Sequence, residues 1–338
     1  MFVIAHLVPT GVGAAIGGFA GDAGPAARVL AAVCDRLVTH PNAVNGADLS
    51  ALPPGALYVE GRALDGWLAG RTGLLPDRPQ RIGILIDAAV TPATLDATLN
   101  AANAVRAVHG VDVVGYHLTA EPLGCQLGWA NGVSTGEVAR PEALLDGARR
   151  LVAAGATAIA ILADLGDYDD TAYRQGRGVD PIGGLEAILS HLVVSELGIP
   201  AAHAPLMPLD LAPQPLVDPR AAAEYIGHTY LPCVLLGLAR HPGLARPDAP
   251  GALPPASLVV VPAGCLGGPG VLAAVARGIP VIAVAENATV LAVTAEALGL
   301  PAWPAANYLE AAGMAAALRA GVDWRACRRP LASVLKIP

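Results

Sequence analysis

Apolar runs rich in β-branched residues alternate along the chain with alanine-rich stretches of helical spacing. Strands buried on both faces are predicted at residues 2–8, 35–40, 56–61, 81–87, 111–118, 156–164, 199–205, 257–264 and 279–286. Helices are predicted at 24–35, 91–110, 140–155 and 268–278. Continuous apolar strands separated by helices predict an α/β protein with mostly parallel sheets covered by helices, arranged as two α/β lobes with a cleft between them.

Two proline-rich segments with little apolar periodicity interrupt this pattern, at residues 203–219 and 241–255. Such segments are typical of linkers or lids. We therefore predict an N-terminal α/β domain at 1–204, a proline-rich linker at 205–219 and a C-terminal α/β domain at 220–338. The second proline-rich segment is interpreted as a surface excursion before the strand at 257–264.

Charged residues are sparse, and acidic ones outnumber basic ones. Of the 338 residues, 54% are hydrophobic and 14% are charged, the formal net charge is −7, and Lys336 is the sole lysine. A chain without a basic patch is not expected to bind nucleic acid, whereas its scattered arginines suffice for one small anionic metabolite. Because so few charges are present to cover the surface, we expect a homo-oligomer.

No apolar run is long enough to cross a membrane, because proline, glycine, glutamate or asparagine breaks each candidate. The apolar start of the chain has no lysine or arginine before Arg28, so it is interpreted as a buried strand and a loop rather than a signal peptide. Five cysteines with no CxxC or zinc-type spacing favour a reducing cytoplasm without disulfides. We therefore expect a cytoplasmic protein with no membrane partner.

A glycine-rich segment follows the first predicted strand, at the place where parallel sheets bind ligands. Gly11, Gly13 and Gly17 let the backbone approach a ligand, and a helix start near Pro25 favours an anion there. A tight packing turn is the equal alternative. A dinucleotide fold needs an acidic residue at the end of the second strand, which ends instead in Thr39 and a histidine. No cofactor is therefore expected, although a nucleotide- or NAD(P)-dependent enzyme stays as an alternative.

Two other strand ends present polar side chains. In the loop THPNAVN, His40 is a candidate acid or base near neutral pH, and Asn42 and Asn45 are candidates for orienting a carboxylate or amide. Local turn capping by the asparagines is the alternative. The strand at 279–286 ends in Glu286 and Asn287, which we expect to face the same cleft as the loop that follows the strand at 257–264.

The middle of the chain, between residues 168 and 198, is the segment richest in polar groups. Arg174 and Arg177, flanked by glycines, are candidates for gripping a substrate carboxylate at two points. Glu186 and His191 lie five residues apart, so they do not share one helix face cleanly, and this spacing disfavours a metal site. No metal is therefore expected.

The stretch VVVPAGCLGGPG joins a buried strand to a glycine-rich bend before a helix. Cys265 would lie at the positive end of the helix dipole, which predicts a lowered thiol pKa and a reactive thiolate that acts as nucleophile or base. The backbone amides of Gly264, Gly267 and Gly268 are candidates for binding an anion whether or not the thiol reacts. A buried, structural cysteine is the alternative.

Motifs spread over nearly the whole chain resemble the uncharacterised family catalogued as domain of unknown function 3326: VPTGVGAAIGGFAGDA, VTHPNAVN, LYVEGRALD, GVDPIGGLEAILSHL, HTYLPCVLLGL and VAENATVLAVTAEALG. That resemblance implies no activity. Two short segments are also similar to the aspartate/glutamate racemase superfamily, in which two strands end at catalytic cysteines. Here AAGATAIAILAD ends in Asp164 while VVVPAGCLGG keeps Cys265, which argues against two-base racemisation and leaves one-cysteine chemistry open.

Taken together, these features predict a cofactor-independent enzyme of isomerase or lyase type that transfers protons on a small carboxylate- or phosphate-bearing metabolite. The glycine loops would hold the anion, and Cys265 or His40 would move the protons. Two alternatives stay open. One is the nucleotide- or NAD(P)-dependent enzyme, and the other is a non-catalytic protein that binds a small molecule or serves in an assembly.

Overall fold

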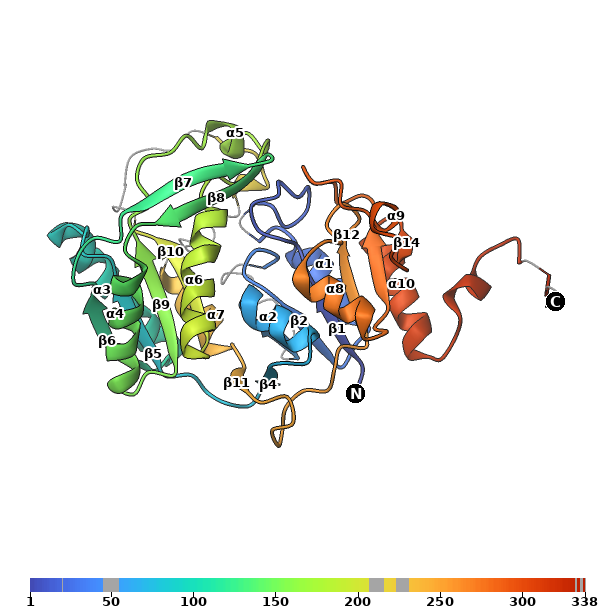
Figure 1. Cartoon of the computed structure of the whole chain (residues 1–338), viewed down its shortest axis with the longest axis horizontal. Helices are drawn as coiled ribbons and strands as arrows, with labels where there is room; N and C mark the ends of the chain where they lie inside the picture. Colours follow the sequence, from blue (N-terminus) through green and yellow to red (C-terminus); the bar gives the residue numbers. More distant parts are fainter. Residues whose placement is uncertain are drawn as a thin grey trace.

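The chain folds into two α/β lobes, each built on a parallel sheet (Figure 1). The computed structural model describes residues 1–19, 21–44, 55–206, 216–222, 231–331, 333, 334 and 337. Parallel strands alternate with helices in both lobes, which confirms the α/β class predicted from the apolar runs.

The first lobe contains a six-stranded parallel sheet in the order β14-β13-β12-β1-β2-β3. Its strands are β1 (Val3–His6), β2 (Arg36–Thr39), β3 (Ala56–Tyr58), β12 (Leu258–Pro262), β13 (Val281–Val284) and β14 (Trp303–Ala305). The strand order reverses between β1 and β12, because β2 and β3 extend from one side of β1 and β13 and β14 from the other. A parallel sheet forms a crevice at such a reversal, outside the carboxyl ends of the strands.

The second lobe contains a four-stranded parallel sheet in the order β10-β9-β5-β6, with a reversal between β5 and β9. Its strands are β5 (Ile82–Ile86), β6 (Val113–Leu118), β9 (Ala158–Ala163) and β10 (Ala201–Pro205). An antiparallel hairpin of β7 (Cys125–Ala130) and β8 (Val133–Val138) packs on the start of a long helix of the same lobe. A short antiparallel pair, β4 (Gly73–Leu75) and β11 (Gly243–Ala245), lies where the chain crosses between the lobes.

Helices cover both sheets. Those of the first lobe are α1 (Gly24–Ala31), α2 (Gly61–Leu68), α8 (Pro269–Ala276), the short α9 (Ala295–Leu298) and α10 (Tyr308–Arg319), followed by a 3-10 turn, η3 (Trp324–Cys327). Those of the second lobe are α3 (Pro92–His109), α4 (Pro141–Ala153), the short α5 (Thr171–Arg174), α6 (Gly183–Leu197) and α7 (Leu231–Ala239). Helices α2 and α6 face each other across the two lobes (Figure 1).

The membership of the sheets differs from the predicted division into domains 1–204 and 220–338. Strand β1 pairs in parallel with β12, with Ile4 opposite Leu258, so the two ends of the chain build one lobe. The middle of the chain, from β5 to α7, forms the other lobe. Apolar periodicity locates a strand but does not choose its neighbour, which explains why a boundary based on proline content missed this arrangement. Most of the predicted linker at 205–219 lies outside the described residues.

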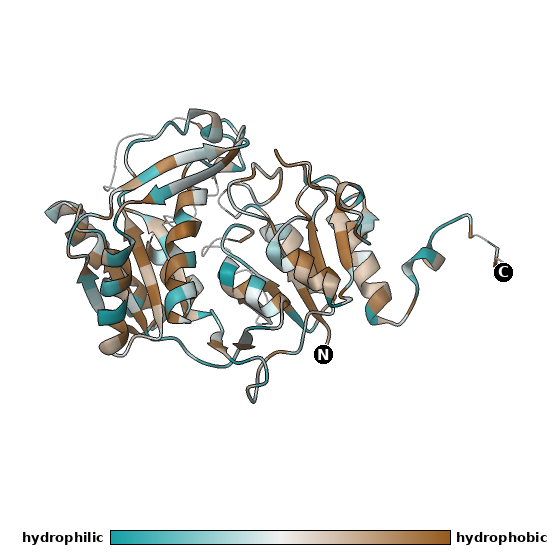
Figure 2. Cartoon of the chain, viewed as in Figure 1, coloured by the Kyte–Doolittle hydropathy of each residue, from teal (hydrophilic) through white to brown (hydrophobic). Residues whose placement is uncertain are grey.

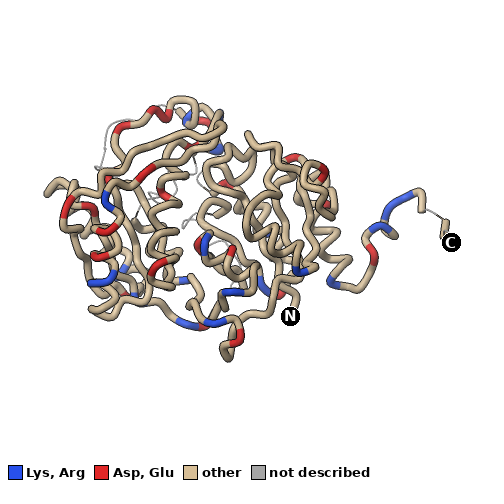
Figure 3. Tube along the Cα trace, viewed as in Figure 1, with Lys and Arg blue, Asp and Glu red and all other residues tan. Residues whose placement is uncertain are grey.

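The apolar core is continuous between the lobes. Leu64 and Trp67 of α2 belong to the same buried cluster as Leu189 and Val193 of α6. Hydrophobic residues concentrate on the strands and on the inner faces of the helices (Figure 2). Charged residues are sparse, and both signs are dispersed over both lobes (Figure 3). Among the described residues, no helix combines the length and the apolarity needed to span a membrane.

Candidate functional site

The candidate site is organised around Glu60, a carboxylate that follows strand β3 of the first lobe. Its extended backbone (φ −60°, ψ 145°) ends the strand segment and begins α2, and its Oε2 accepts a hydrogen bond from the N–H of Ala63 at 2.9 Å. This is an N-cap, which satisfies one of the free amides at the helix start. The Glu60 side chain is only 2% exposed. The sheet and the cap therefore fix a buried carboxylate at the edge of the first lobe.

His191 of α6, in the second lobe, is the partner of that carboxylate. Its Nδ1 is paired with Oε1 of Glu60, while 43% of the His191 side chain stays exposed. A Cβ at Gly61 would lie 3.0 Å from Cε1 of His191, so glycine there leaves room for the ring. No described residue hydrogen-bonds to Nε2 of His191. The pair thus presents one imidazole nitrogen to a ligand and uses the other for orientation.

Electrostatics favour an ionised Glu60. Burial on its own would raise the Glu60 pKa. The hydrogen bond and charge of His191, together with the N–H groups of Ala63 and Arg62, outweigh the effect of burial, so the Glu60 pKa is lowered. A carboxylate bonded to Nδ1 selects the tautomer with its proton on Nδ1 and stabilises the imidazolium that forms when Nε2 takes up a second proton. The arrangement is that of a histidine acid–base group with an orienting carboxylate.

Three further histidines lie within electrostatic reach of this pair and are held neutral. His241 accepts a hydrogen bond from the Glu60 N–H at Nε2 (3.0 Å), and its Nδ1 lies 2.7 Å from the Pro242 carbonyl oxygen, which fixes the tautomer with the proton on Nδ1. His203 of β10 contacts the Ser190 hydroxyl through Nδ1 at 3.0 Å. Burial lowers the pKa of His40, His203 and His241 to about 4 in each case. His191 therefore differs from them in being half exposed and bonded to a carboxylate.

His40, which the sequence suggested as an acid or base, has a positional role in the structure. Its side chain is buried, at 7% exposure, and its Nε2 accepts the Val8 N–H at 2.9 Å. Asn42 donates from Nδ2 to the carbonyl oxygens of Val8, Pro9 and Gly17 at 2.7, 3.1 and 2.8 Å. These bonds fix the loop after β1, in line with the structural alternative for this motif. Asn45 lies outside the described residues.

The first glycine loop does bind an anion, but the anion is the protein's own carboxylate. Oδ1 of Asp22 accepts the N–H groups of Gly17 and Phe19 at 2.5 and 3.3 Å. The carbonyl oxygen of Gly11 accepts the Ser134 N–H of the hairpin at 3.0 Å. Gly13, with φ 58°, packs so closely that a Cβ would lie 2.9 Å from Val179. The predicted ligand loop is therefore packed between the two lobes.

The second glycine loop shows the same pattern. Oδ1 of Asp65, on α2, accepts the N–H of Gly270 at 2.9 Å in the first turn of α8. The carbonyl oxygen of Gly264 accepts the Val293 N–H at 2.8 Å. Gly267 packs against the same valine, Val293, and Gly268 is the N-cap residue of α8. A carboxylate of the chain therefore already lies at the start of α8, beside the glycines that we expected to hold a substrate anion.

Cys265 is buried beneath this loop, at 3% exposure, and its Sγ lies 3.4 Å from the Thr289 hydroxyl. Burial raises the pKa of the Cys265 thiol despite that hydrogen bond, so the predicted lowering of the pKa is wrong. Asp65 accepts the Gly270 N–H, so a carboxylate already lies at the N-terminus of α8. Its burial favours the structural alternative for Cys265, and the role of Cys265 as a nucleophile stays a prediction.

Glu286 and Asn287, at the end of β13, fix neighbouring segments. Oε1 of Glu286 accepts the Tyr308 N–H at 2.8 Å at the start of α10. Asn287 is fully buried and donates to the Tyr308 hydroxyl and the Ile16 carbonyl oxygen, both at 2.8 Å, while accepting the Ile16 N–H at 2.9 Å. These side chains join the loops after β1 and β13 and the start of α10, and their hydrogen bonds are to other residues of the chain.

Arg174 and Arg177 belong to a separate region, beyond the carboxyl end of β9. Arg174 pairs with Asp170 at 2.6 Å and, with Asp164, borders a cavity of about 520 Å³. Arg177 is exposed and donates to Gln175. The structure does not bring them to the Glu60–His191 pair. Within the described part of the chain, no three His, Cys, Asp or Glu side chains are grouped as a metal site.

The comparisons place the chain in a family. The model described as "Protein of unknown function (DUF3326)" matches residues 3–328. The chain belongs to this DUF3326 family. A relative, an uncharacterized lipoprotein of Synechococcus sp., is 46% identical over 327 residues, which cover 94% of this chain and 90% of that protein. No solved structure matches the chain. The aspartate/glutamate racemase likeness receives no support from these findings.

In this DUF3326 protein, sequence reasoning missed the pair that the structure brings together. Glu60 stands in YVEG, at the end of the strand predicted at 56–61, and an acidic residue at a strand end is a usable signal. His191 has no such local signal, because its spacing from Glu186 disfavours a shared site on their helix. Their contact crosses two lobes and 131 sequence positions, so no local spacing reveals it.

Proposed function

We propose that this DUF3326 protein is a cofactor-independent enzyme that transfers protons on a small metabolite, with His191 as the acid–base group. The observation that carries the proposal is the Glu60–His191 pair at the junction of the two lobes. A buried carboxylate with a lowered pKa supports a histidine that cycles between neutral and protonated forms. The four other described histidines whose pKa is lowered by burial, His6, His40, His203 and His241, have no hydrogen-bonded carboxylate, which singles out the His191 ring.

The proposed chemistry uses both nitrogens of His191. Nδ1 stays bonded to Glu60, and Nε2, with its free lone pair, removes a proton from a carbon atom next to a carbonyl or carboxylate group of the substrate. The electron pair left on carbon is delocalised onto the substrate's oxygen. In a β,γ-unsaturated substrate, the protonated Nε2 then returns the proton to the γ carbon as the double bond moves into conjugation, giving an isomer. In a substrate with a leaving group on the β carbon, the electron pair forms a double bond, the bond to the leaving group breaks, and Nε2 protonates that group, giving a lyase product. Protons and electrons balance without an added reactant.

Exchange with heavy water tests this proposal before the substrate is known. The full chain is incubated in D₂O with pooled small carboxylates and phosphate esters, and deuterium incorporation at carbon is followed by mass spectrometry. We expect exchange with the wild type and a loss of about 10²- to 10⁴-fold in His191→Asn. His109→Asn, an exposed histidine at the end of α3, is the matched control and should exchange as the wild type does. Equal exchange in His191→Asn would reject the proposal.

We also propose a cytoplasmic, homo-oligomeric protein that binds neither nucleic acid nor membrane. Five free cysteines and the scarcity of charge support this. The Synechococcus relative bears the name lipoprotein, which describes that protein. Cell fractionation and light scattering on the purified chain test both parts. Recovery in the membrane fraction contradicts the proposed location, and a monomer at micromolar concentration contradicts the proposed assembly.

A further inference from the structure

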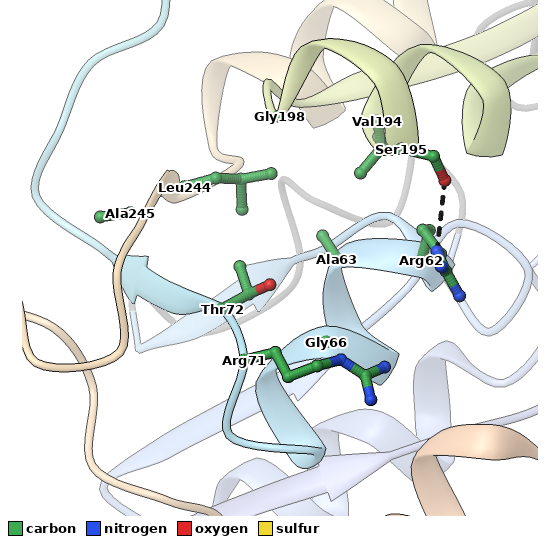
Figure 4. Close-up of a pocket in the computed structure, with 10 residues that line it drawn as sticks. All are labelled: Arg62, Ala63, Gly66, Arg71, Thr72, Val194, Ser195, Gly198, Leu244 and Ala245. Carbon is green, nitrogen blue, oxygen red and sulfur yellow. Dashed lines mark hydrogen bonds between the residues drawn. The ribbon is translucent and has the colours of Figure 1, made fainter.

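The cavity between α2 and α6 has the composition of an anion site. Its volume is about 330 Å³, and its lining includes Arg62, Arg71, Thr72 and Ser195 together with small and apolar residues (Figure 4). None of the described residues that line it is acidic. Many other arginines of the chain are ion-paired, for example Arg149 with Asp146. Two exposed arginines thus line one cavity that has no lining carboxylate among the described residues, in a chain whose net charge is negative.

The sequence places Arg71 there through the turn that ends α2. Gly70 takes a left-handed conformation (φ 70°), and the N–H groups of Arg71 and Thr72 bond to the Gly66 carbonyl oxygen at 2.8 and 3.2 Å. A Cβ at Gly66 would collide with the Thr72 hydroxyl. The glycines thus hold the Thr72 hydroxyl and the Arg71 backbone at the rim, and the structure gives the Arg71 guanidinium no partner among the described residues.

Arg62 and Ser195 join the cavity across the two lobes. Nε of Arg62 donates to the Ser195 hydroxyl oxygen at 3.2 Å (Figure 4). Since that oxygen is the acceptor, the Ser195 O–H is left to donate to a ligand. A hydroxyl donor beside the Arg62 guanidinium, with Arg71 lining the same cavity, matches the oxygen atoms of a phosphate or carboxylate, which accept several charge-assisted hydrogen bonds.

The cavity also lies close to the proposed acid–base pair. Ser195 follows His191 by one helical turn, which is about 6 Å along α6. Arg62 lies two residues beyond Glu60 at the start of α2. The separation is one that a metabolite of a few carbon atoms can span, with its anionic group in the cavity and its reacting carbon at Nε2 of His191.

We infer that Arg62 and Arg71, with the Ser195 hydroxyl, form the subsite for the phosphate or carboxylate group of the substrate. The assignment of this anion as substrate rests on the proposed function. The inference that an anion binds there does not depend on the proposed function. Because Arg62 and Ser195 come from different lobes, an anion bound there also holds the two lobes together.

Calorimetric titration of the full chain with inorganic phosphate and, separately, with malonate tests this inference at constant ionic strength. We expect saturable binding to the wild type and about tenfold weaker binding to Arg71→Gln and Arg62→Gln, because each loses a charge-assisted hydrogen bond. Arg106→Gln, an exposed arginine of α3, is the matched control and should bind as the wild type does. The tighter of the two probes identifies the anion class.

The outcomes separate this inference from the proposed function. No saturable binding, equal binding by Arg71→Gln, or an equal loss in Arg106→Gln overturns the subsite, whatever the exchange experiment shows. Anion binding that depends on Arg71, found together with an absence of deuterium exchange, keeps the anion site and overturns the proton transfer. If exchange depends on His191 but Arg71→Gln does not change the anion affinity, the proton transfer is kept and the subsite is overturned.

Discussion

Oδ1 of Asp65 accepts the backbone N–H of Gly270 at 2.9 Å, so a carboxylate of α2 occupies the N-terminus of α8. Asp22 does the same for the amides of Gly17 and Phe19 in the loop after β1. Both glycine loops therefore attract negative charge, as backbone amides at helix starts and turns do. In this chain two of the chain's own carboxylates supply that charge, and the proposed ligand site lies elsewhere, at the junction of the lobes.

Removing the Asp65 carboxylate should destabilise the fold. Asp65→Ala leaves the first turn of α8 without its acceptor, and we expect a loss of about 1 kcal/mol in the free energy of unfolding. Urea denaturation followed by circular dichroism measures it. The control Asp77→Ala removes an exposed carboxylate of the same lobe and should change little. Equal midpoints for the two variants would contradict the proposed role of Asp65.

Neutralising the carboxylate at residue 60 should impair proton transfer. In Glu60→Gln the amide no longer stabilises an imidazolium, so we expect deuterium exchange to fall by about 10²-fold. Glu196→Gln, which changes an exposed carboxylate on α6, should retain full exchange. Thermal melting of both variants shows whether the fold is intact. A Glu60→Gln protein that is folded and fully active would show that the pair is structural.

Acid should destabilise the protein through its buried histidines. Burial lowers the pKa of His6 to about 3 and those of His40 and His241 to about 4, against 6.5 for the unfolded chain. A group whose folded pKa is depressed contributes stability above its unfolded pKa, and that stability is lost as pH falls from 6.5 towards 4. The upper limit is roughly 3 kcal/mol for each of His40 and His241 and roughly 5 kcal/mol for His6. The raised pKa values of Asp65 and Asp87 act in the opposite sense and reduce the net slope.

Urea unfolding at pH 7.5 and at pH 5 measures this effect. We expect the unfolding midpoint to be lower at pH 5. His109→Asn should not alter the difference between the two pH values, because His109 is exposed at the end of α3. A midpoint that is equal or higher at pH 5 would mean that the buried rings are protonated in the folded state.

Thiol reactivity should separate the five free cysteines. Cys327 is exposed, whereas Cys265 is buried with a raised pKa. A chromogenic disulfide reagent should therefore modify Cys327 first, and Cys327→Ser should remove this fast phase. Cys265→Ala should keep wild-type deuterium exchange and lose some stability, since it truncates a buried side chain. A fast-reacting Cys265, or loss of exchange in Cys265→Ala, would restore it as a reactive group.

The sequence predicted the individual strands and helices well, because a buried strand can be recognised from the apolar residues of its own segment. The apolar runs at 2–8 and 257–264 contain β1 and β12, and the stretch 91–110 contains α3. The pairing of β1 with β12 cannot be recognised in this way, since a buried parallel strand can pair with any other buried parallel strand. The predicted domain boundary failed for this reason.

The candidate site was predicted less completely than the fold. His40 and Asn287 hydrogen-bond to the loop after β1, and carboxylates of the chain accept N–H groups of Gly17 and Gly270 in the two glycine loops. The sequence indicates which residues are able to bind a ligand. It does not indicate which of them form hydrogen bonds with other residues of the folded chain instead. The Glu60–His191 pair depends on how α6 of one lobe packs on α2 of the other, and that is decided by tertiary packing.

A double-mutant comparison of deuterium exchange tests the central claim most directly. Exchange rates are measured for the wild type, His191→Asn, Glu60→Gln and the double variant, with the most responsive metabolite of the pool. If the two residues act as a unit, the double variant should be no slower than His191→Asn. Exchange by His191→Asn at the wild-type rate, or a double variant whose loss is the product of the two single losses, would contradict the account.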